Sequence, residues 1–344
     1  MLYIGMDVHK KNLEVCVLDA LGQRLQSIKV RNDKESVVRF VNSLDQPGSL
    51  ALEPTHNWTA LYDLLERLGL DVHVCHPRDA ELIGKCRIKT DKNDAYKLAA
   101  LLRAGFLPES YVPDPDGREI RKLVRSRSSL VRLGTQVKNQ VHAVLRENWI
   151  EHDYSDLFGK GGREFLDSLK IDDAYKLVIT SRLQVLWQIQ EQIKPLDEEI
   201  IRRAYLDRRA VLLMTILGVG PFSALLILGE IGDIRRFQRA ESLVNFSGLH
   251  PSEDSSGDTI RRGRITKRGS SWLRWILIQV VLHTIKQEGK IRDLYLRVLA
   301  KKGHGRAIVA AARELLVSIY WMLKRMEPFR PSGRKEPIVT GEAR

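Results

Sequence analysis

The first nineteen residues, MLYIGMDVHKKNLEVCVLD, constrain the fold of this chain more than any other stretch. Leu2 to Met6 form an apolar run that ends in a single carboxylate, Asp7, and a polar break separates it from a second apolar run. Because apolar residues fill both faces of the first run, we interpret the pair as a β-hairpin whose first strand is buried. A charge at the end of a buried strand must be compensated. Asp7 is therefore either a turn cap or a metal ligand.

The net charge of the chain indicates which classes of molecule it can bind. The 344 residues carry a formal net charge of +13 with a pI of about 9.7, and 43% of them are hydrophobic. Such an excess predicts a polyanionic partner, because basic surfaces bind phosphates with release of counterions. We find no lipid-facing amphipathic helix, lipidation motif, membrane-length apolar run or secretory signal. Three cysteines without metal-ligand spacing indicate reduced thiols. We therefore expect a cytoplasmic protein with no membrane partner.

The order of apolar runs predicts an α/β domain followed by α-helical ones. Residues 1–110 begin with three strands in a meander and continue with strands alternating with helices. That order describes a mixed sheet with helices on its faces, the order of an RNase H-like domain.

Composition changes after a Pro- and Asp-containing linker. Residues 116–202 hold two long helical patterns, and the second has the spacing of a coiled-coil seam, with Pro195 the one residue against an unbroken helix. We expect a projecting coiled-coil arm. Residues 203–328 predict a mainly α domain, in which Ile216–Pro221 has the form of a helix-hairpin-helix-like element. Residues 329–344 are polar and predicted to be disordered.

Four carboxylates of the first domain are expected to converge. Glu53 ends a later strand that could lie parallel to the strand ending at Asp7, and the two ends would then share one edge of the sheet. Asp91 and Asp94 begin a helix on one face, although acidic residues there also complement the helix dipole. Carboxylates without His or Cys partners favour hard cations, above all Mg²⁺. Two such ions about 4 Å apart can hold the attacking and leaving oxygens of a phosphodiester.

A second group of interest is basic. Ser255, Ser256 and Gly257 have the composition of an ordinary turn, but a cluster of cations follows them that could bind the phosphates flanking a scissile bond. A serine hydroxyl needs a base, a metal or charge stabilisation to act as a nucleophile, and no His–Asp constellation is evident nearby. The long helix before the arm carries further arginines, which form either a solvated face or a phosphate-tracking one. The predicted nucleic-acid-binding residues are Arg121, Arg125, Arg132, Lys138, Arg261, Arg262, Arg264, Lys267 and Arg268.

Several motifs occur together in one order: YIGMDVHKKNLEVCVLD, ALEPTHNW, KTDKNDAYKLAALL, KLVRSRSSLVRLGTQVKNQVHAVL, LGVGPFSALLILGEIGDIRRF and GLHPSEDSSGDTIRRGRITKRGSSWLR. In this order they resemble the DEDD-type transposases of an insertion-sequence family, the bridge-RNA-guided serine recombinases. The resemblance covers nearly the whole chain.

The resemblance implies a Holliday-junction-resolvase-like (RuvC-like) version of the RNase H fold. It implies that Asp7, Glu53, Asp91 and Asp94 hold Mg²⁺ and that Ser256 is the nucleophile, with Ser255 one residue away as the alternative. By this analogy the carboxylates and the serine form a composite site, often across subunits of a homo-oligomer, from dimer to tetramer. The serine would become covalently linked to DNA, and a bridge RNA would pair with target and donor DNA.

Two other functions fit the same residues. The first is a metal-dependent, structure-specific DNA nuclease that activates water and has a purely structural Ser256. The second is a non-enzymatic nucleic-acid scaffold whose carboxylates no longer bind metal.

Overall fold

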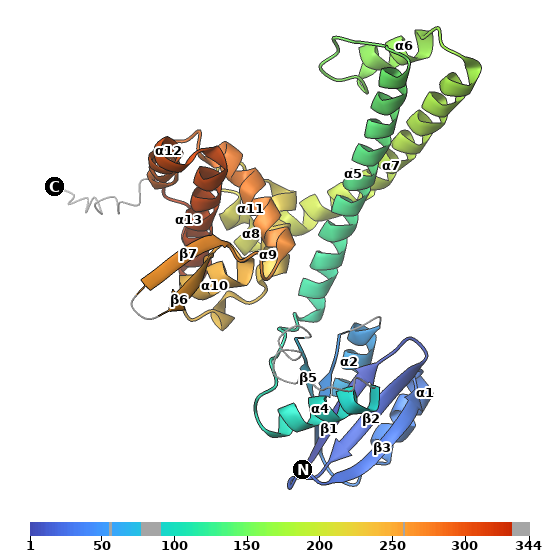
Figure 1. Cartoon of the computed structure of the whole chain (residues 1–344), viewed down its shortest axis with the longest axis vertical. Coiled ribbons are helices and arrows are strands. Elements are labelled where there is room, and N and C mark those ends of the chain that lie inside the picture. The colour runs from blue at the N-terminus through green and yellow to red at the C-terminus, as the bar shows by residue number, and fades with distance from the viewer. Residues whose placement is uncertain (55–56, 77–90, 257–258, 332–344) are drawn as a thin grey trace, which may run out of the picture. The chain divides into compact units, whose positions relative to one another are not determined.

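The computed structural model describes residues 1–54, 57–76, 91–256 and 259–331, with the side chains of Asp91 and of residues 253–262 excepted (Figure 1). These residues form two compact units, Met1–Val112 and Pro113–Arg344.

The first unit is built on a five-stranded mixed sheet. Its strands are β1 (Leu2–Val8), β2 (Asn12–Leu18), β3 (Arg24–Arg31), β4 (Gly48–Leu52) and β5 (Asp71–Val74). The order across the sheet is β3-β2-β1-β4-β5, with β2 antiparallel to β1 and β3, and β4 parallel to β1 and β5. This order, with helices on both faces, confirms the predicted RNase H-like fold class.

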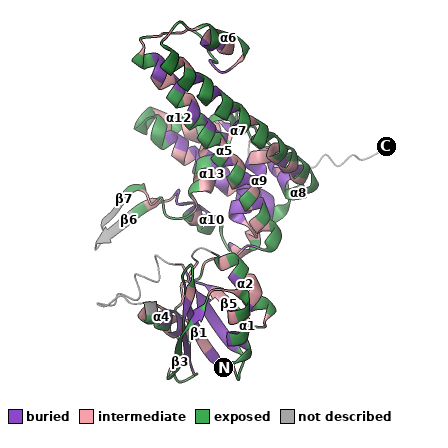
Figure 2. Ribbon diagram, turned by 90° about the vertical axis from the view of Figure 1, so that its right-hand side faces the viewer, coloured by how far each residue is buried: buried purple, intermediate pink, exposed green. Residues whose placement is uncertain are grey.

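Helices cover both faces of this sheet. On one face α1 (Lys34–Asn42) and α2 (Trp58–Arg67) pack over the larger apolar core, which contains Ile4 and Met6. The other face is covered by α4 (Asp91–Arg103). The sheet carries mostly small residues on this face, and α4 can therefore approach it closely. Figure 2 shows the central strands as the buried part of this unit. The site residues of the unit lie on the α4 face.

The second unit contains the predicted arm. Its helices are α5 (Pro115–Glu147), α6 (Lys160–Ser168) and α7 (Asp173–Leu206). The side chain of Asp114 caps α5 by accepting a hydrogen bond from the Gly117 amide at 2.7 Å. α7 runs unbroken through Pro195, so this proline does not end the helix. The predicted pair of long helices is therefore present (Figure 1).

Two separate hydrophobic clusters hold the arm. Its outer part has a cluster of its own, which includes Val141, Leu183 and Leu186. Its root belongs to a different cluster, because Ile120 of α5 and Ile200 of α7 pack into the core of the C-terminal helices.

The C-terminal helices surround α9 (Pro221–Ile231), which is buried from Ser223 to its end (Figure 2). The other helices of this part are α8 (Arg208–Leu213), the short helix η1 (Ile234–Arg236), α10 (Ala240–Ser247), α11 (Ser271–Thr284), α12 (Lys290–Lys302) and α13 (His304–Arg325). One two-stranded sheet, β6 (Pro251–Ser256) and β7 (Thr259–Ile265), interrupts the helices. The predicted mainly α character is confirmed. The predicted disordered tail lies almost wholly outside the described residues.

Candidate functional site

Asp7 lies on the face of the sheet that α4 covers. Along β1, Tyr3, Gly5 and Asp7 occupy this face, because side chains alternate along a strand and Ile4 and Met6 belong to the opposite core. Asp7 is 7% exposed although it lies one residue from the end of β1.

The close approach of α4 depends on a glycine. A Cβ atom at Gly5 would lie 1.9 Å from the carbonyl oxygen of Ala95 and 2.6 Å from the amide nitrogen of Ala99. Only a residue without a side chain therefore fits at this position of β1. Asp94 directly precedes Ala95, so this contact holds the first turn of α4 and its carboxylate against the strand that carries Asp7.

Glu53 is positioned by the parallel ladder between β1 and β4. Met6 is the register partner of Leu52, and the amide of Glu53 donates a hydrogen bond to the carbonyl of Met6 at 3.3 Å. Glu53 thus takes the next position of the ladder, beside Asp7. The prediction that the two strand ends lie at one edge of the sheet matches this register.

Two of the described carboxylates, Asp7 and Asp94, have nitrogen-bearing side chains beside them. His9 Nε2 lies 3.1 Å from Asp7 Oδ2, and Lys97 Nζ lies 2.9 Å from Asp94 Oδ1. Within the part of the chain that the structure describes, no three His, Cys, Asp or Glu side chains are close enough together to hold a metal ion. The side chain of Asp91 lies outside that part. The strands and helix thus bring Asp7, Glu53 and Asp94 into one neighbourhood but not into a coordination shell.

Sequence reasoning missed a further buried carboxylate, Glu14. It is the register partner of Asp7 in the antiparallel ladder between β1 and β2, and it is 6% exposed. Lys29, its own register partner on β3, has its Nζ 3.2 Å from Glu14 Oε1. Lys29, Glu14, Asp7 and Glu53 therefore follow one another across the sheet. The signal in the sequence was a charge inside an apolar strand.

This donor set fits a hard divalent cation. Asp7 and Glu14 are neighbours across the ladder, where like charges are destabilising. Their burial weakens the screening by water that would otherwise relieve the repulsion. The carboxylate oxygens of Asp7, Glu14 and Glu53 are hard donors of the kind that Mg²⁺ prefers, while His9 Nε2, 3.1 Å from Asp7 Oδ2, is a softer donor at the same place.

The two serines lie at the end of a strand rather than in a loop. Ser255 and Ser256 are the last residues of β6, and Ser256 is the register partner of Thr259, the first residue of β7. Their side chains, and Gly257 itself, lie outside the described residues.

The predicted cations after the serines belong to the same hairpin and its exit. Arg261, Arg262 and Arg264 are in β7, while Lys267 and Arg268 lead from it to α11. Arg264, Lys267 and Arg268 are exposed. The backbone amide of Lys267 donates to the carbonyl of Gly248 at 3.2 Å, which ties the exit of the hairpin to the end of α10.

Two of the predicted arginines of α5 have partners inside the unit. The Arg121 guanidinium donates to the backbone carbonyls of Gly229 and Glu230. Arg125 donates from Nε to Glu230 Oε1 at 2.9 Å, and Ser270 Oγ donates to the other oxygen of Glu230 at 2.7 Å. Glu230 is 2% exposed. These contacts fix α5 to the C-terminal core.

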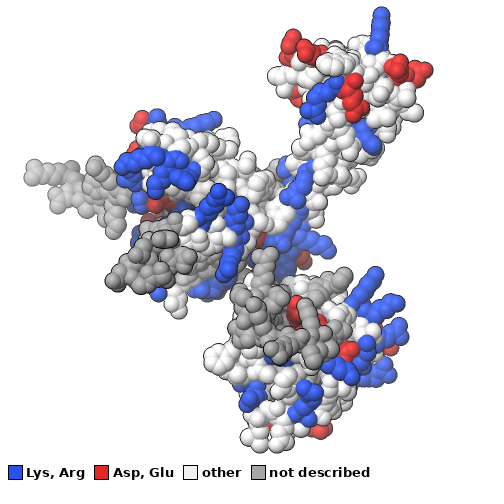
Figure 3. Space-filling view, in the orientation of Figure 1, with Lys and Arg blue, Asp and Glu red and all other residues white. Residues whose placement is uncertain are grey.

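Arg132 and Lys138, farther along α5, contact aromatic rings instead. The Arg132 guanidinium lies 5.5 Å from the ring centre of Trp272, and Lys138 Nζ lies 5.0 Å from that of Phe158. Neither makes an ion pair with a described residue. In the space-filling view, Lys and Arg side chains line the root of the arm, whereas acidic and basic side chains mix at its tip (Figure 3).

Comparison with known proteins identifies the family. A family model described as "Transposase", for DEDD transposases of the IS110 type, matches residues 4–150, and one described as "Transposase IS116/IS110/IS902 family" matches residues 210–296. The chain is 30% identical over 282 residues to a putative transposase of Sinorhizobium fredii, covering 81% of this chain and 68% of that one. The chain belongs to the IS110-type family of DEDD transposases.

Other relatives of this transposase extend the match over its length. It is 26% identical over 340 residues to the transposase for insertion sequence element IS1111A of Coxiella burnetii, covering 95% of this chain and 91% of that one. It is 25% identical over 351 residues to a probable family 20 transposase of Pseudomonas aeruginosa, covering 95% and 98%. The transposase is accordingly a DNA-processing enzyme of an insertion sequence.

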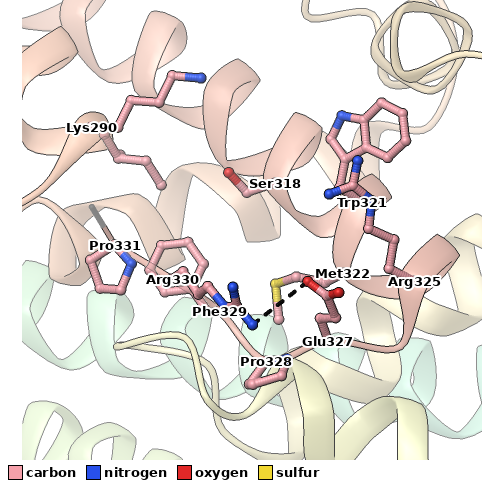
Figure 4. Close-up of a pocket in the computed structure, with 11 residues that line it drawn as sticks. Lys290, Ser318, Trp321, Met322, Arg325, Glu327, Pro328, Phe329, Arg330 and Pro331 are labelled. Carbon is pink, nitrogen blue, oxygen red and sulfur yellow. Dashed lines mark ion pairs between the residues drawn. The ribbon is translucent and has the colours of Figure 1, made fainter. Parts of the chain in front are cut away.

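The described part of the transposase also has a cavity of about 330 Å³ between α12, α13 and the segment that follows α13 (Figure 4). Its wall includes the cations Lys290, Arg325 and Arg330 and the indole of Trp321. Lys290 pairs with Glu314 at 2.5 Å. None of the predicted catalytic or nucleic-acid-binding residues lines this cavity, so it is separate from the predicted site.

No described helix of the transposase is both long enough and apolar enough to cross a bilayer.

Proposed function

We propose that this transposase is a site-specific DNA recombinase that cuts and rejoins DNA through Ser256, with Mg²⁺ held by Asp7, Glu53, Asp91 and Asp94. The observation that carries the metal site is the backbone hydrogen bond from Glu53 to Met6. It puts Glu53 beside Asp7 on the face where α4 begins with the other two carboxylates.

The proposed reaction exchanges one phosphoester bond for another. The Ser256 Oγ forms a bond to the phosphorus of a DNA phosphodiester as the bond from phosphorus to the leaving deoxyribose oxygen breaks. The hydroxyl gives up its proton, and the leaving oxygen takes one to become a free hydroxyl. A deoxyribose hydroxyl then attacks the phosphorus of the serine ester, the bond from phosphorus to Ser256 Oγ breaks, and the serine regains a proton as the attacking hydroxyl loses one, which rejoins a strand. When bound, Mg²⁺ supplies stabilisation of the negative charge that develops on the phosphate.

The cations beside the serines support this role. Arg264, Lys267 and Arg268 are exposed at the end of the β6–β7 hairpin and after it. Guanidinium and ammonium groups at such positions neutralise DNA phosphates and fix the register of the duplex without reading its sequence. Sequence choice then has to come from another component. A bridge RNA that pairs with donor and target DNA would supply it, in a homo-oligomer of the transposase.

Serine substitution tests the chemistry. Full-length protein with Ser256→Ala should form no SDS-resistant protein–DNA adduct and no rejoined product, whereas Ser255→Ala should keep both. Adducts that persist in Ser256→Ala but vanish in Ser255→Ala would move the nucleophile by one residue. If Ser256→Ala still cuts DNA, the chain is a water-using nuclease and the serine is structural.

Metal dependence and RNA guidance need separate experiments. Chelation of divalent cations should stop cleavage, and added Mg²⁺ should restore it. Sequencing of the RNA that copurifies with the protein from its host should reveal one structured RNA encoded by the element. Recovery of only heterogeneous RNA would contradict guidance and leave the serine chemistry standing. Undiminished transposition by an Asp7→Ala, Asp94→Ala double variant would instead favour a non-enzymatic scaffold.

A further inference from the structure

Three aromatic rings gather where α9 begins and α11 runs past it. The ring centres of Trp272 and Trp275 are 6.1 Å apart with an angle of 83° between planes, and those of Phe222 and Trp275 are 6.5 Å apart at 72°. We call Phe222, Trp272 and Trp275 the aromatic cluster. Its members meet edge to face, the arrangement that aromatic pairs prefer.

One member of the cluster is open to solvent. Trp275 is 42% exposed, while Phe222 and Trp272 are only partly exposed. Along the same stripe of α11, Leu282 is exposed as well. An exposed indole keeps apolar area in contact with water that burial would stabilise, so a surface indole of this kind is well suited to a ligand with a flat apolar face.

Cations from α5 surround the aromatic cluster. The guanidinium of Arg127 lies 4.8 Å from the ring centre of Phe222, and those of Arg125 and Arg132 lie 5.9 and 5.5 Å from that of Trp272. Arg125 and Arg127 are occupied by carboxylates, Glu230 and Asp197. Arg132 pairs with no carboxylate among the described residues. Its charge therefore remains available at the edge of the cluster.

Charge decides which class of ligand fits this surface. A second copy of the transposase would bring another strongly basic protein, with +13 per chain, against Arg132. DNA, the substrate class of this family, brings both a phosphate for the guanidinium and a flat base for the indole. A base inside a duplex is stacked on its neighbours, so only an unpaired base can lie on an indole face.

We propose that the exposed face of Trp275 is the stacking platform for an unpaired DNA base, and that Arg132 pairs with a phosphate of the same strand. The platform accepts any base, because stacking is tolerant of sequence. It does not depend on which group attacks the DNA. It gives the transposase a site for the single-stranded segment that strand cleavage or duplex opening exposes.

The test measures binding of full-length protein to a fluorescent single-stranded oligothymidine and to a duplex of equal length. Trp275→Ala should weaken binding to the single strand by roughly 5- to 100-fold, the value of one base–aromatic stack. It should leave duplex binding unchanged, and Trp275→Phe should restore most of the loss. Arg132→Gln should lower the slope of log affinity against log salt concentration by about 1.

Trp321 provides the matched control. It is 45% exposed, close to the value for Trp275, but the guanidinium of Arg325 already lies 4.6 Å from its ring centre. Trp321→Ala should leave single-strand binding unchanged. Circular dichroism should show that each variant keeps its helical content, and Trp275→Phe keeps the test decisive if Trp275→Ala does not fold.

Three outcomes would overturn the proposal. Equal loss of single-strand and duplex binding in Trp275→Ala would show that the indole acts through folding. Unchanged DNA binding together with a smaller assembly in sedimentation would identify the aromatic cluster as an interface between copies. Loss confined to an oligouridine RNA of the same length would assign the platform to RNA instead of DNA.

Discussion

Glu14 lies directly opposite Asp7 in the antiparallel ladder between β2 and β1, and both carboxylates are buried. Lys29 Nζ forms an ion pair with Glu14, and the imidazole of His9 lies 3.1 Å from Asp7. Two adjacent buried carboxylates favour the uptake of a cation, because the cation removes the repulsion between them. We therefore expect the sheet to be more stable at this point when a cation is bound than when it is not.

The proximity of Asp7 and Glu14 predicts that removing the charge of Asp7 raises stability and lowers activity. In the presence of a chelator, Asp7→Asn should raise the free energy of unfolding by about 0.5–2 kcal/mol, the range for relief of an unfavourable functional group. The same variant should lose strand cleavage by more than the roughly 10–100-fold that removal of an outer-shell partner of a metal costs. Thermal unfolding with chelator and with Mg²⁺, beside a cleavage assay, measures both. Asp45→Asn, at an exposed position, is the control. A less stable Asp7→Asn protein in chelator would contradict the repulsion.

Gly5→Ala should separate α4 from the sheet. The added methyl carbon would lie 1.9 Å from the Ala95 carbonyl oxygen, which is backbone and can move only with the helix. We expect a loss of at least about 1–3 kcal/mol of stability, the cost of overpacking a core, together with lower cleavage activity because Asp94 moves with α4. Gly48→Ala is a matched control, since its Cβ would meet the flexible Ile4 Cδ1 at 3.1 Å. Equal unfolding midpoints for the two variants in urea would refute the close-approach argument.

The pair between Arg125 and Glu230 should respond asymmetrically to substitution. Arg125→Met leaves Glu230, which is 2% exposed, as a buried charge without its cation, and should cost about 3–5 kcal/mol. Glu230→Gln keeps the shape and the Ser270 partner and leaves a half-exposed guanidinium that water can solvate, so it should cost only about 1–2 kcal/mol. Chemical denaturation of each single variant and of the double variant gives the coupling free energy between Arg125 and Glu230. A larger loss for Glu230→Gln would contradict this reading.

The tip of the arm should loosen as the pH falls. Burial, followed by the charges of His152, Arg146 and Lys138, lowers the pKa of His142. The ring of His152 is stacked on it, with centres 5.7 Å apart. In the unfolded arm the histidine takes up a proton near its ordinary pKa of about 6.5, before the folded arm does. Stability is therefore fully present above that pH and is lost as the pH falls from it toward the lowered pKa.

Amide hydrogen exchange at the tip measures this effect. Protection of residues near Val141 and Leu183, corrected for the intrinsic exchange rate, should fall between neutral pH and pH values below the ordinary histidine pKa. His142→Gln should flatten the dependence. The root of the arm, around Val124 and Ile200, serves as the internal control because it belongs to another cluster. Equal loss of protection at root and tip would disprove a local origin.

Much of the fold could be predicted because its signals are local. The apolar run before Asp7 identified a central strand, and the seam through Leu183 and Leu186 identified a long arm helix. Pro195 was the one local objection to that helix. The helix continues through Pro195 because Ile189 before it and Ile200 after it are both buried.

The features that sequence reasoning missed depend on contacts between distant residues. Glu14 could be assigned to the candidate site only after the strand register showed that it lies opposite Asp7. Arg125 could not be assigned to Glu230, 105 residues away, by any pattern along α5. The β6–β7 hairpin was not predicted because PSEDSS lacks alternation of apolar and polar residues.

Pro195 has a mechanical consequence for the arm. The outer cluster of α7 includes Ile189 and the root cluster includes Ile200, so the proline lies between two separately packed lengths of helix. It has no amide hydrogen to offer the carbonyl of Glu191, and one rung of the helical ladder is missing there. We therefore expect α7 to bend more easily at Pro195 than elsewhere along its length. A bend there would move the tip of the arm and leave the packing of Ile200 in the root cluster in place.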